Sequence, residues 1–130
     1  MRGSNDDQQT YKVIGAAMRV HRQLGCGFLE AVYRDALRVE LTSSGIPFEG
    51  EVPFGVVYDD RLLESRYRAD LVCFGEILVE LKAMAAITGR ETAQVLNYLK
   101  ASKLERGLLL NFGARRLEVQ RLSITHQLHR

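Results

Sequence analysis

Residues 68–83, RADLVCFGEILVELKA, decide the fold of this 130-residue chain. Two apolar runs flank a Gly-Glu break, a pattern that is typical of the two strands of a β-hairpin. Three charged residues, Asp70, Glu80 and Lys82, lie inside these runs. Burying an ion without a partner costs several kcal/mol. Either the charges neutralise one another together with something bound between the strands, or the two segments are not buried strands.

The register of this hairpin determines whether the two acids meet. A two-residue loop at the Gly-Glu break would pair Asp70 with Leu81. A three-residue loop at residues 74–76 would pair Asp70 with Glu80 and would gather the charges on one face of the hairpin. Residues two apart on a strand share a face, so Glu80 and Lys82 then point the same way. We expect the three-residue loop, which also makes two apolar cross-strand pairs: Leu71 with Val79, and Cys73 with Ile77.

The three charges have the parts for phosphodiester hydrolysis. Two opposed carboxylates repel unless one is protonated or a cation lies between them. Mg²⁺ or Mn²⁺ is the natural occupant, because such ions take oxygen ligands and keep waters for a substrate phosphate. Lys82, beside that ion, can orient or deprotonate the attacking water, or stabilise negative charge on the phosphate. A structural alternative stays open, in which Lys82 and an acid form a salt bridge at the end of the sheet.

Two helices are expected before the hairpin. Apolar residues at helical spacing from Thr10 to Leu24 predict the first, and Gly25 is placed to end it in a left-handed cap. The same pattern predicts a second helix that begins near Leu29 and ends before Ser43.

The rest of the chain alternates between strand and helix patterns. Residues 46–82 predict three or four antiparallel strands, with a turn at Asp59-Asp60. Thr88, followed three residues later by Glu91, is a capping box that begins a helix running to about Ser102. Two further strands are expected in residues 106–113 and 116–124. The order α-α-β-β-β-α-β-β predicts an α/β (α+β) fold with a mixed central sheet flanked by helices.

Length and composition indicate one domain, because 130 residues with 46% hydrophobic content can build a core without disulfides. We expect this domain to span residues 10–124, with residues 1–9 disordered or an added leader and residues 125–130 a tail. The apolar runs are too short to cross a membrane, and the N-terminus lacks the apolar middle of a signal peptide. A cytoplasmic protein with reduced cysteines is expected.

Five segments of the chain resemble the GxxExxY proteins, a bacterial and archaeal branch of the PD-(D/E)XK nuclease superfamily. The resemblance covers nearly the whole chain from Ile14 to Leu122, and Gly27, Glu30 and Tyr33 meet the motif in the name. One departure is Cys26, which stands where the family has proline between two glycines. A second is GRETAQ, which lacks the histidine that often precedes the glutamine. The segments, in order, are VHRQLGCGFLEAVYRDAL, YRADLV, ILVELKA, AQVLNYLKAS and GLLLNFG.

This resemblance implies a restriction-endonuclease-like core and an Mg²⁺-dependent or Mn²⁺-dependent endo- or exonuclease acting on DNA or RNA. Carried over by position, the catalytic set is Glu30, Asp70, Glu80, Lys82 and Gln94. Asp70, Glu80, Glu30 and the Leu81 carbonyl would ligate the metal, and Gln94 would position a phosphate or water.

Three alternatives stay open at this stage. Glu30 lies in the first turn of its helix, where the helix dipole alone favours an acid. Tyr33 and Tyr98 are expected to pack helices onto the sheet and not to stack on bases. The rival to the enzyme is a non-catalytic nucleic-acid-binding or assembly module with the same fold. In either case we expect a homodimer or a partner protein to supply specificity.

Overall fold

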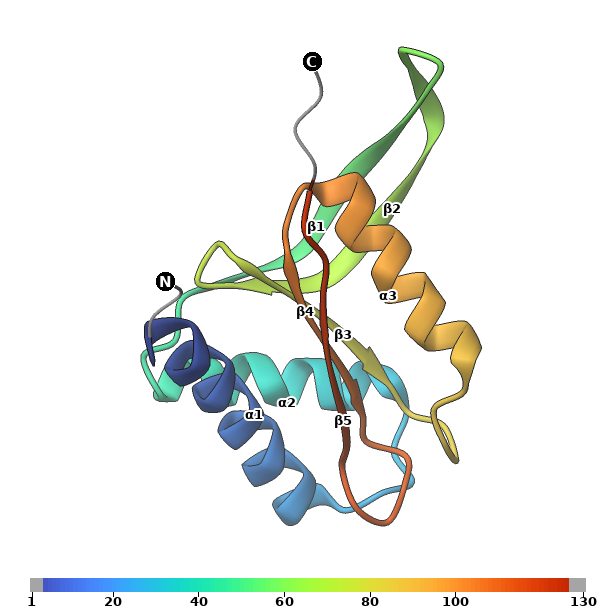
Figure 1. Cartoon of the computed structure of the whole chain (residues 1–130). Helices are drawn as coiled ribbons and strands as arrows, with labels where there is room; N and C mark the ends of the chain where they lie inside the picture. Colours follow the sequence, from blue (N-terminus) through green and yellow to red (C-terminus); the bar gives the residue numbers. More distant parts are fainter. Residues whose placement is uncertain (1–3, 127–130) are drawn as a thin grey trace.

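A computed structural model of the chain describes residues 4–126, which form three helices and five strands in the expected order (Figure 1). The predicted α+β class and mixed sheet are confirmed. The helices are α1 (Ser4–Leu24), α2 (Glu30–Ser43) and α3 (Gly89–Ser102). The strands are β1 (Phe48–Tyr58), β2 (Arg61–Cys73), β3 (Ile77–Lys82), β4 (Arg106–Asn111) and β5 (Glu118–Ser123).

The first helix is longer than its apolar pattern predicted. α1 begins at Ser4, ahead of the expected start at Thr10. The added residues are polar and carry no apolar period, so the sequence pattern did not include them. Its end is as predicted: Gly25 has φ of 70° and its N–H donates to the His21 carbonyl at 2.8 Å. The expectations for residues 1–3 and 127–130 lie outside the described residues.

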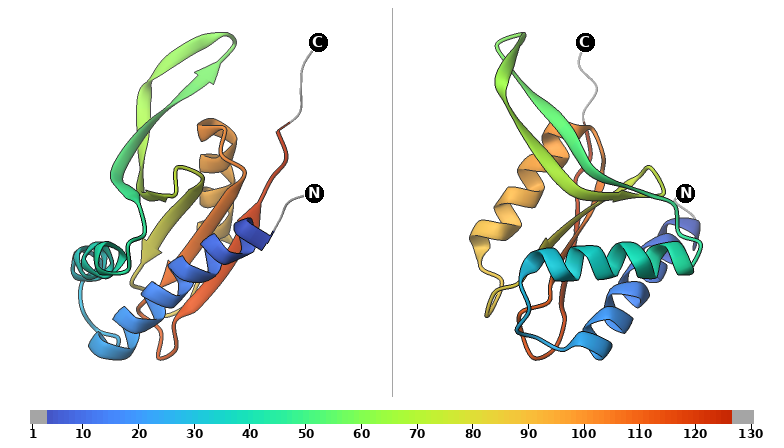
Figure 2. Two further views of the ribbon diagram at one scale, coloured as in Figure 1. Left: turned by 90° about the vertical axis from the view of Figure 1, so that its left-hand side faces the viewer. Right: turned by 180° about the vertical axis from the view of Figure 1, so that it is seen from behind.

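The five strands form one sheet in the order β1-β2-β3-β4-β5. β3 and β4 are parallel and α3 connects them, whereas every other neighbouring pair is antiparallel. Figure 2 shows α1 and α2 on one face of the sheet and α3 on the other. A separate apolar cluster fills each of the two layers. None of the helices in residues 4–126 has the length and hydropathy needed to cross a bilayer.

The faces of the β1–β2 hairpin exchange layers part-way along its length. Leu71 packs in the layer under α1 and α2, whereas Ala69 packs in the layer under α3. In a regular strand these two residues would share a face. Opposite this point on β1, Glu51 has φ of 51°. Asp70 therefore lies where the ribbon passes from one layer to the other, and the outer half of the hairpin extends beyond the sheet (Figure 1).

Asn111 anchors the loop that joins β3 to α3. Its side chain is fully buried, and its Oδ1 accepts from the backbone N–H of Met84 at 2.9 Å and of Gly113 at 3.1 Å. Its Nδ2 donates to the Met84 carbonyl at 2.9 Å and to Glu118 Oε1 at 2.8 Å. All of its hydrogen-bonding capacity is thus used. The loop leads from Lys82 to the capping box of α3, so Asn111 sets how the end of β3 faces this helix.

We predict that Gly113→Ala destabilises the protein. A Cβ at this position would collide with the backbone of Ala83 and Met84, which cannot move aside without breaking the bonds of Asn111. Overpacking of this kind costs about 1–3 kcal/mol. Gly89→Ala is the control, because no atom lies within 4 Å of the added Cβ in the first turn of α3. Thermal melts should show a lowered Tm for Gly113→Ala alone, and equal Tm values would contradict the packing described here.

Candidate active site

The predicted register of the β2–β3 hairpin is confirmed. Leu71 pairs with Val79, Val72 with Leu78 and Cys73 with Ile77, around a three-residue loop at residues 74–76. The same register continued by one position places Asp70 opposite Glu80. At this position the ladder ends.

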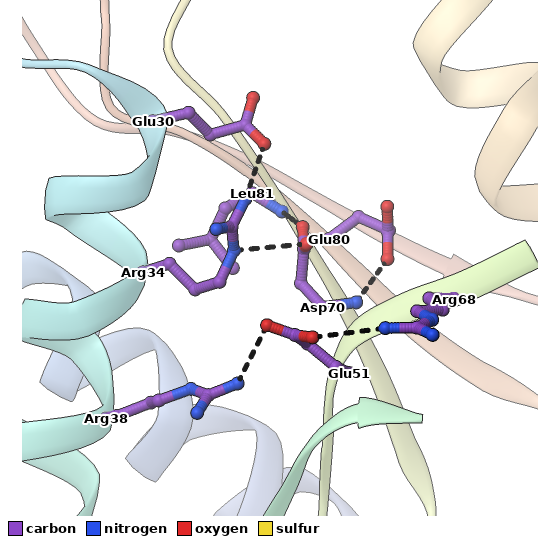
Figure 3. A network of polar contacts seen from close by, with 8 residues as sticks. All are labelled: Glu30, Arg34, Arg38, Glu51, Arg68, Asp70, Glu80 and Leu81. Carbon is purple, nitrogen blue, oxygen red and sulfur yellow. Dashed lines mark hydrogen bonds and ion pairs between the residues drawn. The ribbon is translucent and has the colours of Figure 1, made fainter. Parts of the chain in front are cut away.

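Two reciprocal hydrogen bonds replace the ladder between the acids (Figure 3). The Asp70 backbone N–H donates to Glu80 Oε2 at 2.8 Å, and the Leu81 backbone N–H donates to Asp70 Oδ2 at 2.8 Å. Each carboxylate is thus bound to the backbone of the other strand. The two acids are thereby held side by side in the gap between β2 and β3.

Glu80 has a strongly perturbed pKa. Only 5% of the residue is exposed. Burial raises the pKa of its carboxyl to about 8, and the charge of Asp70 adds to this rise. The hydrogen bond from Asp70 and the charge of Lys82 lower the pKa of Glu80 but do not cancel the rise. At neutral pH this pair carries less than two full charges, and a bound cation would be needed to ionise both acids fully.

Lys82 and Gln94 lie together on the α3 side of the sheet. On β3, Leu78 packs in the layer under α3, so Glu80 and Lys82, at even spacing from it, face that layer too. Lys82 and Gln94 line a pocket of about 470 Å³ between β3 and α3. Of the predicted set, Asp70 and Glu80 are held together near the end of β3, the charge of Lys82 acts on Glu80, and Gln94 shares the pocket with Lys82.

Arg34, which the sequence reasoning missed, links Glu30 to Asp70, and the charge of Glu30 also raises the pKa of Glu80. Arg34 Nη2 lies 3.1 Å from Glu30 Oε2, and Arg34 Nε lies 3.4 Å from Asp70 Oδ1 (Figure 3). The second contact is an ion pair without hydrogen-bond geometry, so Arg34 Nε is a buried donor without an acceptor. The four-residue spacing of Glu30 and Arg34 was the available signal, since such pairs lie side by side on a helix.

The hydrogen bonds of the Tyr33 hydroxyl give a structural reason for the spacing of Gly27, Glu30 and Tyr33. Its hydroxyl donates to the Gly25 carbonyl at 2.6 Å and accepts from the Phe28 N–H at 3.2 Å. Gly27 has φ of 113°, a conformation that favours glycine. These contacts close the loop before α2 and so place Glu30 at the start of the helix. The Tyr33 ring is buried and stacks on Phe112 at 4.9 Å, as the packing prediction for this residue required.

A second group of ion pairs extends the network along α2. Glu51 lies between Arg38, at 3.8 Å, and Arg68, at 3.3 Å (Figure 3). Arg38 Nε, like Arg34 Nε, is buried without a hydrogen-bond partner. Arg34 and Arg38, both on α2, thus each have a buried Nε–H donor without an acceptor near the site.

A comparison of the chain with known protein families now identifies its family. The profile of the PD-(D/E)XK nuclease superfamily matches residues 7–122. The chain belongs to the PD-(D/E)XK nuclease superfamily. The resemblance to this superfamily and the restriction-endonuclease-like core are thereby confirmed. No curated protein matches the chain at a significant level.

The crystal structure of SSO0001 is similar in fold to this PD-(D/E)XK protein, with a TM-score of 0.60 and 18% sequence identity. The aligned region covers 75% of this chain and 50% of SSO0001, so the chain spans about half the length of that protein. At this level of identity the comparison supports the fold alone.

The residues present fit the divalent cation that PD-(D/E)XK nucleases generally use. Asp70 and Glu80 supply carboxylate oxygens. The N–H and C=O of a strand residue face the same neighbour, so the Leu81 carbonyl points toward Asp70 as its N–H does. Mg²⁺ is commonly bound by one or two carboxylates plus substrate phosphates and waters. Within residues 4–126 no group of three or more acidic, His or Cys side chains is placed to hold a metal, so Glu30 as a direct ligand stays a prediction.

We predict that Glu80→Gln stabilises the protein increasingly as the pH rises. An unfolded glutamate titrates near pH ~4.3, whereas Glu80 in the folded chain titrates near 8. Between these values the folded state binds more protons than the unfolded state, so the free energy of unfolding of the wild type falls with rising pH. Glutamine keeps the acceptor oxygen for the Asp70 N–H and carries no charge. At about 1.4 kcal/mol for each unit of raised pKa, the difference should reach a few kcal/mol above pH ~8.

Urea unfolding of both proteins at pH 5 and pH 9 measures this difference. Asp35→Asn, which changes an exposed acid on α2, is the control and should give the same difference at both pH values. A stability gap for Glu80→Gln that stays constant between the two pH values would contradict the raised pKa.

Proposed function

We propose that this PD-(D/E)XK protein is a metal-dependent nuclease of the GxxExxY branch, which hydrolyses phosphodiester bonds in DNA or RNA. The observation that supports it most is the pair of reciprocal bonds that hold Asp70 and Glu80 together, with Lys82 two residues further along β3. Two adjacent acids, one of them with a raised pKa, beside a lysine that lines a pocket are a poor structural device. They are a suitable site for a cation and a phosphate.

Each residue has a definite part in this proposal. Asp70, Glu80 and the Leu81 carbonyl would hold Mg²⁺ or Mn²⁺, which when bound polarises the phosphate and lowers the pKa of a water. Lys82 stabilises negative charge on the phosphate oxygens or orients the attacking water. Gln94, in the same pocket, donates a hydrogen bond to phosphate or water. Glu30 acts at the periphery, through Arg34.

One observation favours a second candidate, a non-catalytic nucleic-acid-binding module. Arg34 lies against Asp70 and already supplies a cation to the acids. A site neutralised in this way needs no metal, and its arginine donors can bind phosphates directly. In either function a homodimer or partner protein would add the surface needed to read a sequence.

We predict that Lys82→Ala loses hydrolysis but keeps Mn²⁺ binding, because the lysine contributes no ligand. The rate should fall about 100-fold or more, as for loss of a group that acts in the transition state. Asp70→Ala and Glu80→Ala should lose both hydrolysis and Mn²⁺ binding, and the double variant should be hardly slower than the worse single one. Glu30→Ala should have a smaller effect, since water can replace a peripheral group.

The assay uses single-stranded, nicked, branched and duplex DNA, and RNA, with Mg²⁺ or Mn²⁺ at low salt, and calorimetry for Mn²⁺ binding. Lys12→Ala, an exposed lysine on α1, is the matched control and should cleave like the wild type. Equal cleavage by Lys82→Ala and wild type would place the activity elsewhere. Absence of both cleavage and Mn²⁺ binding in the wild type would support the binding module.

We also predict that Arg34→Gln tightens Mn²⁺ binding. A guanidinium 3.4 Å from Asp70 Oδ1 competes with a metal cation for the same carboxylate. Its removal should raise the Mn²⁺ affinity by about tenfold, which corresponds to roughly one pKa unit of electrostatic interaction. Calorimetric titration measures this directly. Weaker binding by Arg34→Gln would show that the arginine positions Asp70 for the metal and does not compete with it.

A further inference from the structure

A second pocket lies between the outer half of the β1–β2 hairpin and the C-terminal half of α3. Its volume is about 630 Å³, within the range of about 300–1,000 Å³ that is usual for small-ligand sites. Asn97 and Tyr98 line both this pocket and the one that holds Lys82 and Gln94. The two pockets are therefore neighbours along one face of α3. We call the second one the hairpin pocket.

The charges that line the hairpin pocket are all positive. Arg66 on β2, and Lys100 and Lys103 at the end of α3, line it, and no acidic residue does. All three side chains are exposed, and none forms an ion pair with another described residue. Cations near the C-terminus of a helix are favoured by its dipole, which accounts for Lys100 and for Lys103 at the C-cap but not for Arg66 on the strand. The pocket is therefore complementary to an anion.

The wall of the hairpin pocket is apolar and rigid. Tyr67 and Tyr98 stack with ring centroids 3.7 Å apart, and Phe54 stacks on Tyr67 at 5.4 Å. The Tyr67 hydroxyl donates to the Tyr98 carbonyl at 2.6 Å, which fixes the hairpin to α3. Val56 and Val57 add apolar surface from β1. A flat apolar surface beside unpaired cations matches a ligand that has both a ring system and a phosphate.

We propose that the hairpin pocket binds an unpaired nucleotide of the substrate strand, close to the bond that is cut. The base lies against the aromatic and valine wall, and the adjoining phosphates contact Arg66, Lys100 and Lys103. This inference rests on the proposed function for the class of its ligand. Because a paired base cannot enter such a pocket, the substrate carries a single-stranded segment next to the scissile bond.

The distance between the two pockets along α3 is consistent with one substrate strand that contacts both. Gln94 and Ala101, which line the first and second pockets, are seven residues apart, so they lie roughly 10 Å apart along the helix axis. Successive phosphates of a stacked strand are about 3.4 Å apart along its axis. The unpaired nucleotide would therefore lie within about three nucleotides of the phosphate at Lys82.

Binding of fluorescent oligonucleotides, measured by anisotropy in EDTA, tests the proposal apart from catalysis. The double variant Arg66→Ala, Lys100→Ala should lose about tenfold in affinity for a single-stranded oligonucleotide and much less for a duplex. Lys12→Ala, Arg22→Ala removes the same charge from exposed sites on α1 and is the matched control, with wild-type binding expected. Ser65→Trp fills the pocket from β2 without changing any charge, and should also lose single-strand affinity. Thermal melts establish that each variant is folded.

The other outcomes separate the two proposals. Equal losses for single strand and duplex, or wild-type affinity in Ser65→Trp, would overturn the pocket, even in a protein that cleaves DNA. Single-strand binding that depends on the pocket in a protein that cleaves nothing would uphold the pocket and overturn the nuclease. If light scattering shows a wild-type dimer that Ser65→Trp converts to a monomer, the pocket holds a second copy of the chain and the nucleotide assignment is wrong.

Discussion

The structure depends on one constraint, which is that Asp70 and Glu80 share the gap between β2 and β3. Each carboxylate accepts a hydrogen bond from the backbone of the opposite strand, so neither can leave without depriving a partly buried N–H of its acceptor. This arrangement ends the ladder and coincides with the place where the β1–β2 ribbon turns over. It keeps two acids together at the cost of a strongly raised pKa for Glu80. A strongly perturbed pKa of this kind is typical of functional sites.

Elements of both layers position residues around this pair of acids. α2 brings Arg34 to Asp70 from one side, and the Tyr33 hydroxyl fixes where that helix begins. On the other side, the loop anchored by Asn111 sets α3 beside Lys82. The Tyr67–Tyr98 stack then joins α3 to the outer hairpin. The two acids, the pocket lined by Lys82 and Gln94, and the hairpin pocket are therefore parts of one continuous arrangement.

The sequence predicted those features that depend on local pattern. The hairpin register followed from apolar alternation, because only one loop length places Leu71 and Cys73 opposite apolar partners. The capping box at Thr88 and the left-handed Gly25 were likewise local signals. Arg34 as a partner of Asp70 was not predictable in this way, because the two residues are far apart in the chain and meet only when α2 packs on the sheet. The turn-over of the ribbon at Asp70 coincides with the positive φ of Glu51 on β1, a non-glycine position that no strand pattern singles out.

The central claim is that Asp70 and Glu80 form a coupled pair whose shared charge calls for a cation. Carbon-13 NMR titration of the Glu80 carboxyl, with and without Mg²⁺, tests it most directly. The account predicts a pKa near 8 in the absence of metal, which falls when Mg²⁺ is added or when Asp70 is replaced by Asn. A pKa near ~4.3 that responds neither to Mg²⁺ nor to Asp70→Asn would contradict it.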